Sequence, residues 1–231
     1  MVFRPLTLLC VTVDTTVLRE RVAAMSRHLG ERGLFIGTAG NVSARVDGVV
    51  AITASGIDLT SADADEVTVV DLDGAVLDGH LSPSSEVDLH LGVYRQPQFA
   101  GLSGVVHTHS RFATALSIVC TELPVIHYQQ LSLGGSLRVA PFETFGTPEL
   151  ATAVHSALSG RLAALMANHG AVALGNDLAA AADNALLLEW LCEIYWRAHA
   201  IGAPRTLNES QQHGVIEHAL RIGYGGTKEI G

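Results

Sequence analysis

The chain has 231 residues, of which 48% are hydrophobic and only 16% are charged, so it can bury a large apolar core. Its formal charge of −9, without any cluster of Lys and Arg, argues against a protein that binds the nucleic-acid backbone. The three cysteines, Cys10, Cys120 and Cys192, are odd in number and far apart, as expected of free thiols in the reducing cytoplasm. No apolar run reaches the roughly 18 residues of a membrane helix, so a soluble protein without a membrane partner is expected.

The apolar pattern divides the rest of the chain into strands and helices. Residues 1–13 are expected to form a loose N-terminal extension, and Asp14 offers an N-cap for the first helix. Two Asp-Gly pairs between β-branched runs, at 47–48 and 73–74, predict antiparallel hairpins. Pro83 suits the first position of the next helix. The expected elements, in chain order, are a helix over 18–29, hairpins over 35–53 and 67–77, a helix over 83–96, a strand around 105–109, a short helix over 112–119, extended chain over 125–128, a helix over 149–158, a hairpin over 162–174 and a long helix over 177–201.

This mixture of hairpins and covering helices predicts the fold class. Hairpins require antiparallel pairing, and the helices between them must cover the faces of the sheet, which differs from regular βαβ winding. We therefore expect one α/β domain over residues 1–231, a three-layer α/β/α domain with a central, largely antiparallel sheet. Residues 203–231 carry few strong signals and are expected to form a C-terminal tail.

The sequence His107-Thr108-His109 is the clearest candidate for chemistry. Residues i and i+2 of a strand point to the same face, so the two imidazoles would lie side by side. Imidazole binds zinc and its first-row neighbours, and a catalytic zinc usually takes three protein ligands. A polar strand edge would account for the same pair, so the pair alone leaves both interpretations open.

Two further residues could complete a metal site. His169 lies between Asn168 and Gly170 at an expected hairpin turn and could be a third ligand, although a solvated loop histidine is the alternative. Glu86 falls in the first turn of the helix expected after Pro83, where the helix dipole stabilises a carboxylate. An ordinary first-turn acid is the alternative there.

Three short segments could each donate hydrogen bonds to a phosphate. Glycine lets the backbone approach an anion closely, and hydroxyl groups at a helix start add donors beside free N–H groups. An acidic protein could therefore still bind an anionic small substrate. Each segment alone is also typical of a simple turn. The segments are Gly40-Asn41, Ser55-Gly56 and Ser84-Ser85.

Seven motifs, in this order and spacing, together resemble the class II aldolase/adducin family over about residues 18–197. Within the family the resemblance is to aldolases of the fuculose-1-phosphate type, and it implies the class II aldolase/adducin head fold. The motifs are Gly37-Thr38-Ala39-Gly40-Asn41-Val42-Ser43-Ala44-Arg45, Ile52-Thr53-Ala54-Ser55-Gly56, Pro83-Ser84-Ser85-Glu86, His107-Thr108-His109-Ser110, Ile126-His127-Tyr128, Thr144-Phe145-Gly146-Thr147 and Asn168-His169-Gly170.

The resemblance implies a complete set of site residues. His107, His109 and His169 would bind zinc, with manganese or cobalt as other candidates, and Glu86 would lie near or on the metal. Tyr128 would reach the site of a neighbouring subunit in a homotetramer with active sites at its interfaces. The residues implied to hold the substrate phosphate are Gly40, Asn41, Ser55, Gly56, Ser84 and Ser85.

The implied activity is reversible cleavage of a ketose 1-phosphate, such as fuculose 1-phosphate, to dihydroxyacetone phosphate and an aldehyde. The metal would act as a Lewis acid, and Glu86 would move a proton at the carbon beside the carbonyl. Tyr128 would supply or remove the proton on the aldehyde oxygen. Phe145 would line the sugar-binding region, and Tyr224 in the tail could close over the site.

Other outcomes are possible on the same scaffold. Ribulose-5-phosphate 4-epimerases resemble this chain but carry an acidic residue just after the strand that here reads Ile126-His127-Tyr128-Gln129-Gln130, where no carboxylate stands. Decarboxylases and dehydratases of sugar phosphates share the three histidines and stay open as alternatives. A non-enzymatic, adducin-like interaction module is a further alternative, and the complete histidine set argues against it.

Overall fold

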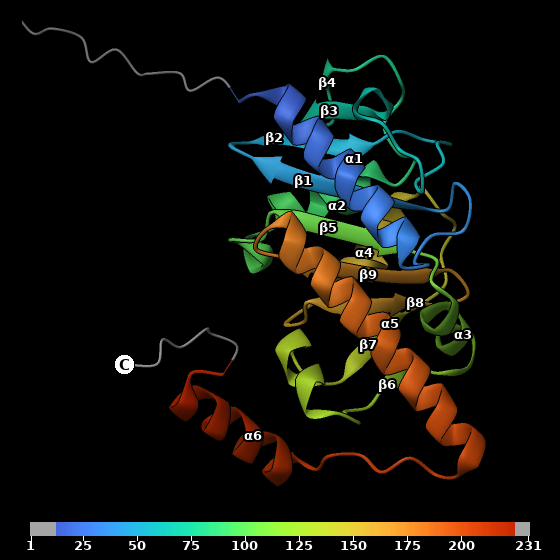
Figure 1. Cartoon of the computed structure of the whole chain (residues 1–231), viewed down its shortest axis with the longest axis vertical. Coiled ribbons are helices and arrows are strands. Elements are labelled where there is room, and N and C mark those ends of the chain that lie inside the picture. The colour runs from blue at the N-terminus through green and yellow to red at the C-terminus, as the bar shows by residue number, and fades with distance from the viewer. Residues whose placement is uncertain (1–12, 225–231) are drawn as a thin grey trace, which may run out of the picture.

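The computed structural model describes residues 13–224, and its strands form a nine-stranded sheet in the order β4-β3-β2-β1-β5-β9-β8-β7-β6 (Figure 1). Every pairing is antiparallel except that of β7 with β8. The strands are β1 (Gly40–Val46), β2 (Val49–Thr53), β3 (Val67–Asp71), β4 (Val76–Asp78), β5 (Gly104–Thr108), β6 (Glu122–Leu123), β7 (Leu137–Ala140), β8 (Ala163–Met166) and β9 (Gly170–Gly175).

Helices cover both faces of this sheet. In Figure 1, α1 and the long α5 cross the near face, and α2 and α4 lie behind the strands. Two separate apolar cores result, because alternate residues of a strand point to opposite faces: Val106 packs in the core beneath α1, α3 and α5, and Val105 packs against α2 and α4. The predicted three-layer fold with a largely antiparallel sheet is confirmed. The helices are α1 (Thr15–Glu31), α2 (Val87–Arg95), α3 (Arg111–Val119), α4 (Pro148–Ala157), α5 (Leu178–Ile201) and α6 (Glu209–Ile222).

The predicted hairpins are present. β1 and β2 are joined by Asp47 and Gly48, both at positive φ, which matches the twist of an antiparallel pair. β8 and β9 are joined by a turn in which Asn168 has a φ of 54°, a conformation that asparagine tolerates better than most residues. This second turn carries His169, so local backbone chemistry decides where that imidazole is placed.

The start of α2 differs from the sequence prediction. The helix begins at Val87 rather than at Pro83, because Pro83 forms an antiparallel bridge with Ala54. The Ser84 N–H donates to the Thr53 carbonyl at 3.1 Å, which keeps this segment extended beside the end of β2. Glu86 is therefore the N-cap residue and not part of the first turn, so its carboxylate is placed by the sheet edge as well as by the helix.

Two other segments depart from expectation. The chain expected to be extended up to Tyr128 turns at that residue into a short 3₁₀ helix over Tyr128–Leu133, capped by His127. The tail contains α6, whose N-terminal capping box pairs Asn208 with Gln211, a signal that the sequence did contain. The predicted N-terminal extension lies almost wholly outside the described residues. Within residues 13–224, no helix has the length and apolar character needed to span a membrane.

Candidate metal centre and active site

Two of the three candidate ligands are placed by the end of β5. His107 is within the strand and has no exposed surface, and His109 follows the last strand residue. Their Nε2 atoms lie 3.0 Å apart. The turn that follows His109 is held from α5, because the Glu189 carboxylate accepts hydrogen bonds from the Phe112 and Ala113 N–H groups at the start of α3. The position of His109 is thus fixed by the strand before it and by a capped helix after it.

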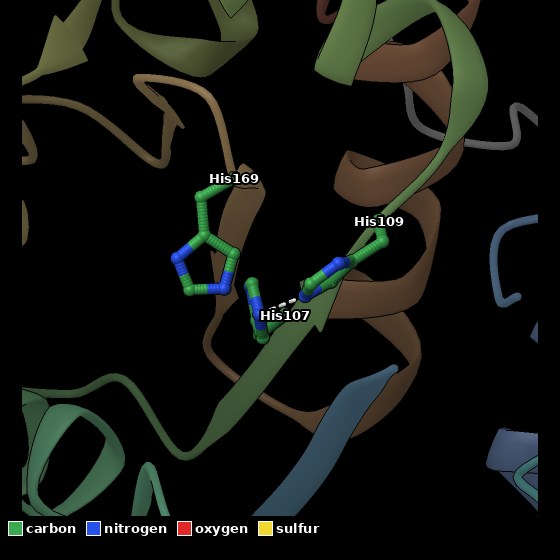
Figure 2. Close-up of side chains that lie close together, drawn as sticks. All are labelled: His107, His109 and His169. Carbon is green, nitrogen blue, oxygen red and sulfur yellow. Dashed lines mark hydrogen bonds between the residues drawn. The ribbon is translucent and has the colours of Figure 1, made fainter. Parts of the chain in front are cut away.

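The third candidate, His169, comes from the turn between β8 and β9. Because β9 pairs with β5, the tip of this hairpin lies beside His107. One ligand atom from each of the three imidazoles lies within 4.8 Å of the others, and Figure 2 shows the rings facing one another. A Cβ atom at Gly170 would stand 2.1 Å from the Thr108 carbonyl oxygen, so only glycine permits this approach.

The imidazoles are prepared to bind a metal ion. His107 donates from Nδ1 to the Ala171 carbonyl at 3.0 Å, which leaves Nε2 as the ligand atom that lies toward the other two rings. Burial, followed by the proximity of His107, lowers the pKa of both His109 and His169 to about 4. Both are therefore neutral near pH 7, which is the form that binds a metal.

Glu86 completes the cluster. It is 6% exposed, and its two carboxylate oxygens lie 3.1 Å from His107 Nε2 and 3.5 Å from His169 Nε2. Burial alone would raise its pKa, but the charge of His107 and hydrogen bonds from His107 and Asn41 hold the pKa well below the usual range. Its Oε1 atom is buried and accepts no hydrogen bond from any described residue. Three imidazoles and one ionised carboxylate are a donor set that fits zinc and its first-row neighbours.

The cluster opens into a cavity of about 150 Å³. All six residues predicted to hold phosphate line it, together with Phe145, Glu86 and two of the histidines. Among the described residues that line it, none is Lys or Arg, so an anion held by these residues would be bound by backbone and hydroxyl donors. The lining residues are Thr38, Ala39, Gly40, Asn41, Ala54, Ser55, Gly56, Ser84, Ser85, Glu86, His109, Phe145 and His169.

The three phosphate-type segments meet because neighbouring elements end at the same place. Gly40 begins β1 opposite Thr108, Ser55 follows the end of β2, and Ser84 is hydrogen-bonded to that same end. Gly40 has a φ of 113°, and a Cβ atom there would lie 2.9 Å from the His107 carbonyl oxygen. Glycine at this position therefore lets the first segment lie directly against the metal-ligand strand.

Asn41 and Tyr128 are placed differently from the other predicted residues. The Asn41 side chain is buried and donates to Glu86 Oε2 at 2.9 Å, so its amide faces the carboxylate. Tyr128 does not line the cavity of its own chain. It is 42% exposed and borders an apolar groove of about 900 Å³ beside α6, with its hydroxyl 3.2 Å from that of Tyr224.

Sequence reasoning missed three residues that support the site. His90 is wholly buried next to Asn41, and Ser43 is hydrogen-bonded to His90. Glu189 caps α3, as described above. The spacing of His90, four residues after Glu86, is a detectable signal because residues i and i+4 share a helix face.

A family model described as the class II aldolase and adducin N-terminal domain matches residues 20–196. The chain belongs to this family. Class II aldolases are metal-dependent lyases, and the three histidines are the potential metal site of this class II aldolase family member. The resemblance drawn from the seven motifs is confirmed.

Curated relatives extend over most of the chain. It is 37% identical over 201 residues to the 5-deoxy-D-ribulose 1-phosphate aldolase of Bacillus thuringiensis serovar kurstaki, covering 86% of this chain and 93% of that protein. It is 36% identical over 205 residues to the L-fuculose phosphate aldolase of Escherichia coli K12, covering 88% and 94%. Among solved structures, an L-fuculose 1-phosphate aldolase superposes with a TM-score of 0.82 at 32% identity, covering 87% of this chain and 95% of that one.

Metal analysis tests the donor set. We expect protein purified without chelator to hold one divalent cation per chain, and His169→Ala to bind it more than about 100-fold more weakly. Mutation of a residue that only supports a metal ligand already lowers metal affinity about 10- to 100-fold, and His169 offers a ligand atom itself. Elemental analysis and metal titration would measure this. His155→Gln is the control, because His155 is a buried histidine that contacts the Leu89 carbonyl away from the cluster. Full metal occupancy in His169→Ala would exclude it as a ligand.

Proposed function

We propose that this chain is a zinc-dependent, cytoplasmic aldolase that cleaves a ketose 1-phosphate reversibly to dihydroxyacetone phosphate and an aldehyde. One observation carries the proposal: a buried, ionised carboxylate and three imidazoles stand at one wall of a cavity whose other walls are turns suited to phosphate. The aldolase names of relatives at 36% and 37% identity support the same reaction.

Each part of the cavity has a role in this proposal. The substrate phosphate is bound by the segments containing Gly40, Ser55 and Ser84, whose glycines and hydroxyl groups offer donors without a competing charge. His107, His109 and His169 would hold zinc, with manganese and cobalt also suited to imidazole. A bound metal supplies Lewis acidity to the ketose oxygen atoms. Phosphate and reacting carbons are thereby held at opposite walls of one small cavity.

Glu86 performs the proton transfer at carbon. Cleavage breaks the bond between the third and fourth carbons, and the carbon that becomes part of dihydroxyacetone phosphate must gain a proton. In the synthetic direction the same proton is removed. In the synthetic direction the ionised carboxylate accepts that proton, and in cleavage the protonated carboxyl group returns it to the same carbon. The Oε1 atom, which accepts no hydrogen bond from any described residue, is free to do so.

In a homotetramer, Tyr128 supplies or removes the proton on the aldehyde oxygen of the substrate that is bound in a neighbouring subunit. Its position supports this, because it is exposed and lies outside the cavity of its own chain. The cavity is also edged by exposed residues, including Phe145 at 68% exposure, where a second chain could complete the wall. In this arrangement Phe145 lines the sugar-binding region, and Tyr224 lies next to Tyr128.

The substrates we favour are 1-phosphates of deoxy ketoses. Fuculose 1-phosphate and 5-deoxyribulose 1-phosphate both yield dihydroxyacetone phosphate, and both leave an aldehyde that ends in a methyl group. The two relatives reported above carry these substrates in their names. The cavity fits the shared half of both molecules, and the aldehyde half would be selected by residues near Phe145.

Decarboxylation is the main alternative. The chain is 34% identical over 189 residues to the 3-oxo-tetronate 4-phosphate decarboxylase of Haemophilus influenzae, covering 77% of this chain and 86% of that protein. The substrate of a decarboxylase carries a carboxylate as well as a phosphate, and within residues 13–224 no Lys or Arg lines this cavity to pair with it. A dehydratase, a 4-epimerase and a non-enzymatic module are less well supported, the epimerase because residues 126–130 contain no carboxylate.

A product assay separates these activities. We expect the zinc-loaded protein to release dihydroxyacetone phosphate from fuculose 1-phosphate or 5-deoxyribulose 1-phosphate, followed by coupled reduction to glycerol 3-phosphate. Release of carbon dioxide from a 3-oxo-tetronate 4-phosphate, or loss of water without carbon–carbon cleavage, would instead assign another reaction to this scaffold. Protein that is purified without chelator, holds no zinc, manganese or cobalt, and turns over none of these compounds would favour the interaction module.

Glu86→Gln tests the proton-transfer role. The amide keeps the shape of the side chain but cannot accept a proton, and general acid–base catalysis is worth about 10²- to 10⁴-fold. We expect kcat to fall by that order while zinc content and the affinity for inorganic phosphate change little. Asp88→Asn is a matched control, because Asp88 is an exposed carboxylate on the same helix. Wild-type turnover in Glu86→Gln would remove this residue from the mechanism.

Mixed oligomers test whether Tyr128 acts across an interface. Tyr128→Phe and Glu86→Gln chains should each be nearly inactive, yet together they should form sites that pair an intact Glu86 with an intact Tyr128 of the neighbour. Random mixing in a cyclic tetramer would restore about a quarter of the sites. Light scattering would confirm four copies. No recovery on mixing would place Tyr128 in its own chain's site or outside catalysis.

A further inference from the structure

A row of buried polar side chains extends from Glu86 into the protein, away from the cavity. It lies between β1, which contributes Asn41 and Ser43, and α2, which contributes His90 and Tyr94. These four residues are at most 5% exposed. Buried polar groups are costly unless hydrogen-bonded, so a continuous row of them needs an explanation.

The row exists because two periodicities coincide. Asn41 and Ser43 are two residues apart on a strand, which advances about 6.6 Å. Glu86, the N-cap of α2, precedes His90 by four residues, and His90 precedes Tyr94 by four, a spacing that advances about 6 Å in a helix. Because the two spacings nearly match, side chains from the strand and from the helix alternate along the row.

The hydrogen bonds connect every member. Asn41 Nδ2 donates to Glu86 Oε2 at 2.9 Å, and Asn41 Oδ1 contacts His90 Nε2. Ser43 Oγ lies 2.6 Å from His90 Nδ1 and 2.7 Å from the Tyr94 hydroxyl. The far end is anchored by Arg45, which lies over the Tyr94 ring and donates to the Tyr94 carbonyl at 2.9 Å.

The hydrogen-bond donors of the row can all point toward Glu86. An ionised carboxylate only accepts, so the Asn41 amide must present its NH₂ group to Glu86 and its oxygen to His90. His90 Nε2 must then carry the proton, and Nδ1 must accept from Ser43, whose oxygen accepts from Tyr94. Burial, followed by the nearby His107, lowers the pKa of His90 to about 3, which is consistent with this neutral tautomer.

We propose that His90 is a positioning residue for Glu86, acting through Asn41. The Nε2–H group of His90 locks the Asn41 amide in one orientation, and the locked amide holds Glu86 Oε2. This keeps Oε1 directed toward His169 and the cavity. The proposal rests on the proposed function, because it assigns Glu86 the proton transfer, and it adds a residue that touches neither substrate nor the three histidines that form the candidate metal site.

Two substitutions of His90 that differ in hydrogen-bonding capacity test this proposal. In His90→Gln the terminal amide nitrogen can occupy the place of Nε2 and still donate to Asn41, whereas His90→Leu cannot donate. We expect kcat to fall about 10- to 100-fold in His90→Leu, the usual range for a supporting residue, with KM nearly unchanged and partial recovery in His90→Gln. His155→Gln should keep wild-type kcat, because His155 also packs against α2 but lies outside the row. Equal loss in His155→Gln and His90→Leu would reduce His90 to a packing role.

A double-mutant cycle separates this proposal from the proposed function. If His90 acts only through Glu86, adding His90→Leu to Glu86→Gln should lower kcat no further. A rise in KM with unchanged kcat would instead mean that the row serves phosphate binding through Asn41, as the sequence predicted, and would overturn the positioning role. Full activity of Glu86→Gln would refute the proposed function itself, whatever His90→Leu does.

Two readouts do not depend on activity. Crystal structures should show the Glu86 carboxylate turned away from His169 in His90→Leu but not in His90→Gln. Proton NMR of the wild type should show a low-field imidazole resonance that is lost in both His90 variants, shifts in Ser43→Ala and persists in His155→Gln. If His90→Leu does not fold, Ser43→Ala and Tyr94→Phe replace it, since each interrupts the row at a smaller cost in volume. An unmoved Glu86 in every variant would contradict the proposal.

Discussion

The burial of the Glu86 carboxylate is the constraint on which the rest of the site depends. An ionised carboxylate with 6% exposure persists only where charge and hydrogen bonds replace water. His107 and Asn41 supply that compensation from two neighbouring strands. The other oxygen accepts no hydrogen bond from any described residue and lies 3.5 Å from His169 Nε2. The contacts with His107 and Asn41 that keep Glu86 charged also fix the orientation of its carboxylate.

The sheet order makes this compensation possible. β1, β5 and β9 are neighbours in the sheet, although they lie far apart in the sequence, and their pairing brings Asn41 opposite His107 and the β8–β9 turn beside the end of β5. The segment around Ser84 is tied to the end of β2 and delivers Glu86 to the same place. Antiparallel pairing thus gathers ligands, carboxylate and phosphate-type turns at one end of the central strands. Apolar cores pack against both faces of these strands.

Several features could be predicted from local chemistry alone. Asp47-Gly48 specified a hairpin because both residues tolerate positive φ, and the motif with His107 and His109 specified two imidazoles on one side. The start of α2 could not be predicted, because Pro83 is equally suited to a first helical turn and to an edge bridge. Only the nearby end of β2 decides between them. The helix α6 was missed although Asn208 and Gln211 form a capping box, because none of its residues is buried and its apolar pattern is weak.

By itself the sequence determined the family, the fold class and the kinds of group at the site, because these depend on residue type, order and spacing. Tertiary structure alone decided which groups meet. It placed His169 within reach of His107 across strands, turned the Asn41 amide to Glu86, and aligned His90 and Tyr94 with Ser43 in a buried row. It also left Tyr128 outside the cavity of its own chain. Contacts between residues distant in sequence depend on strand order and helix packing, which local patterns do not encode.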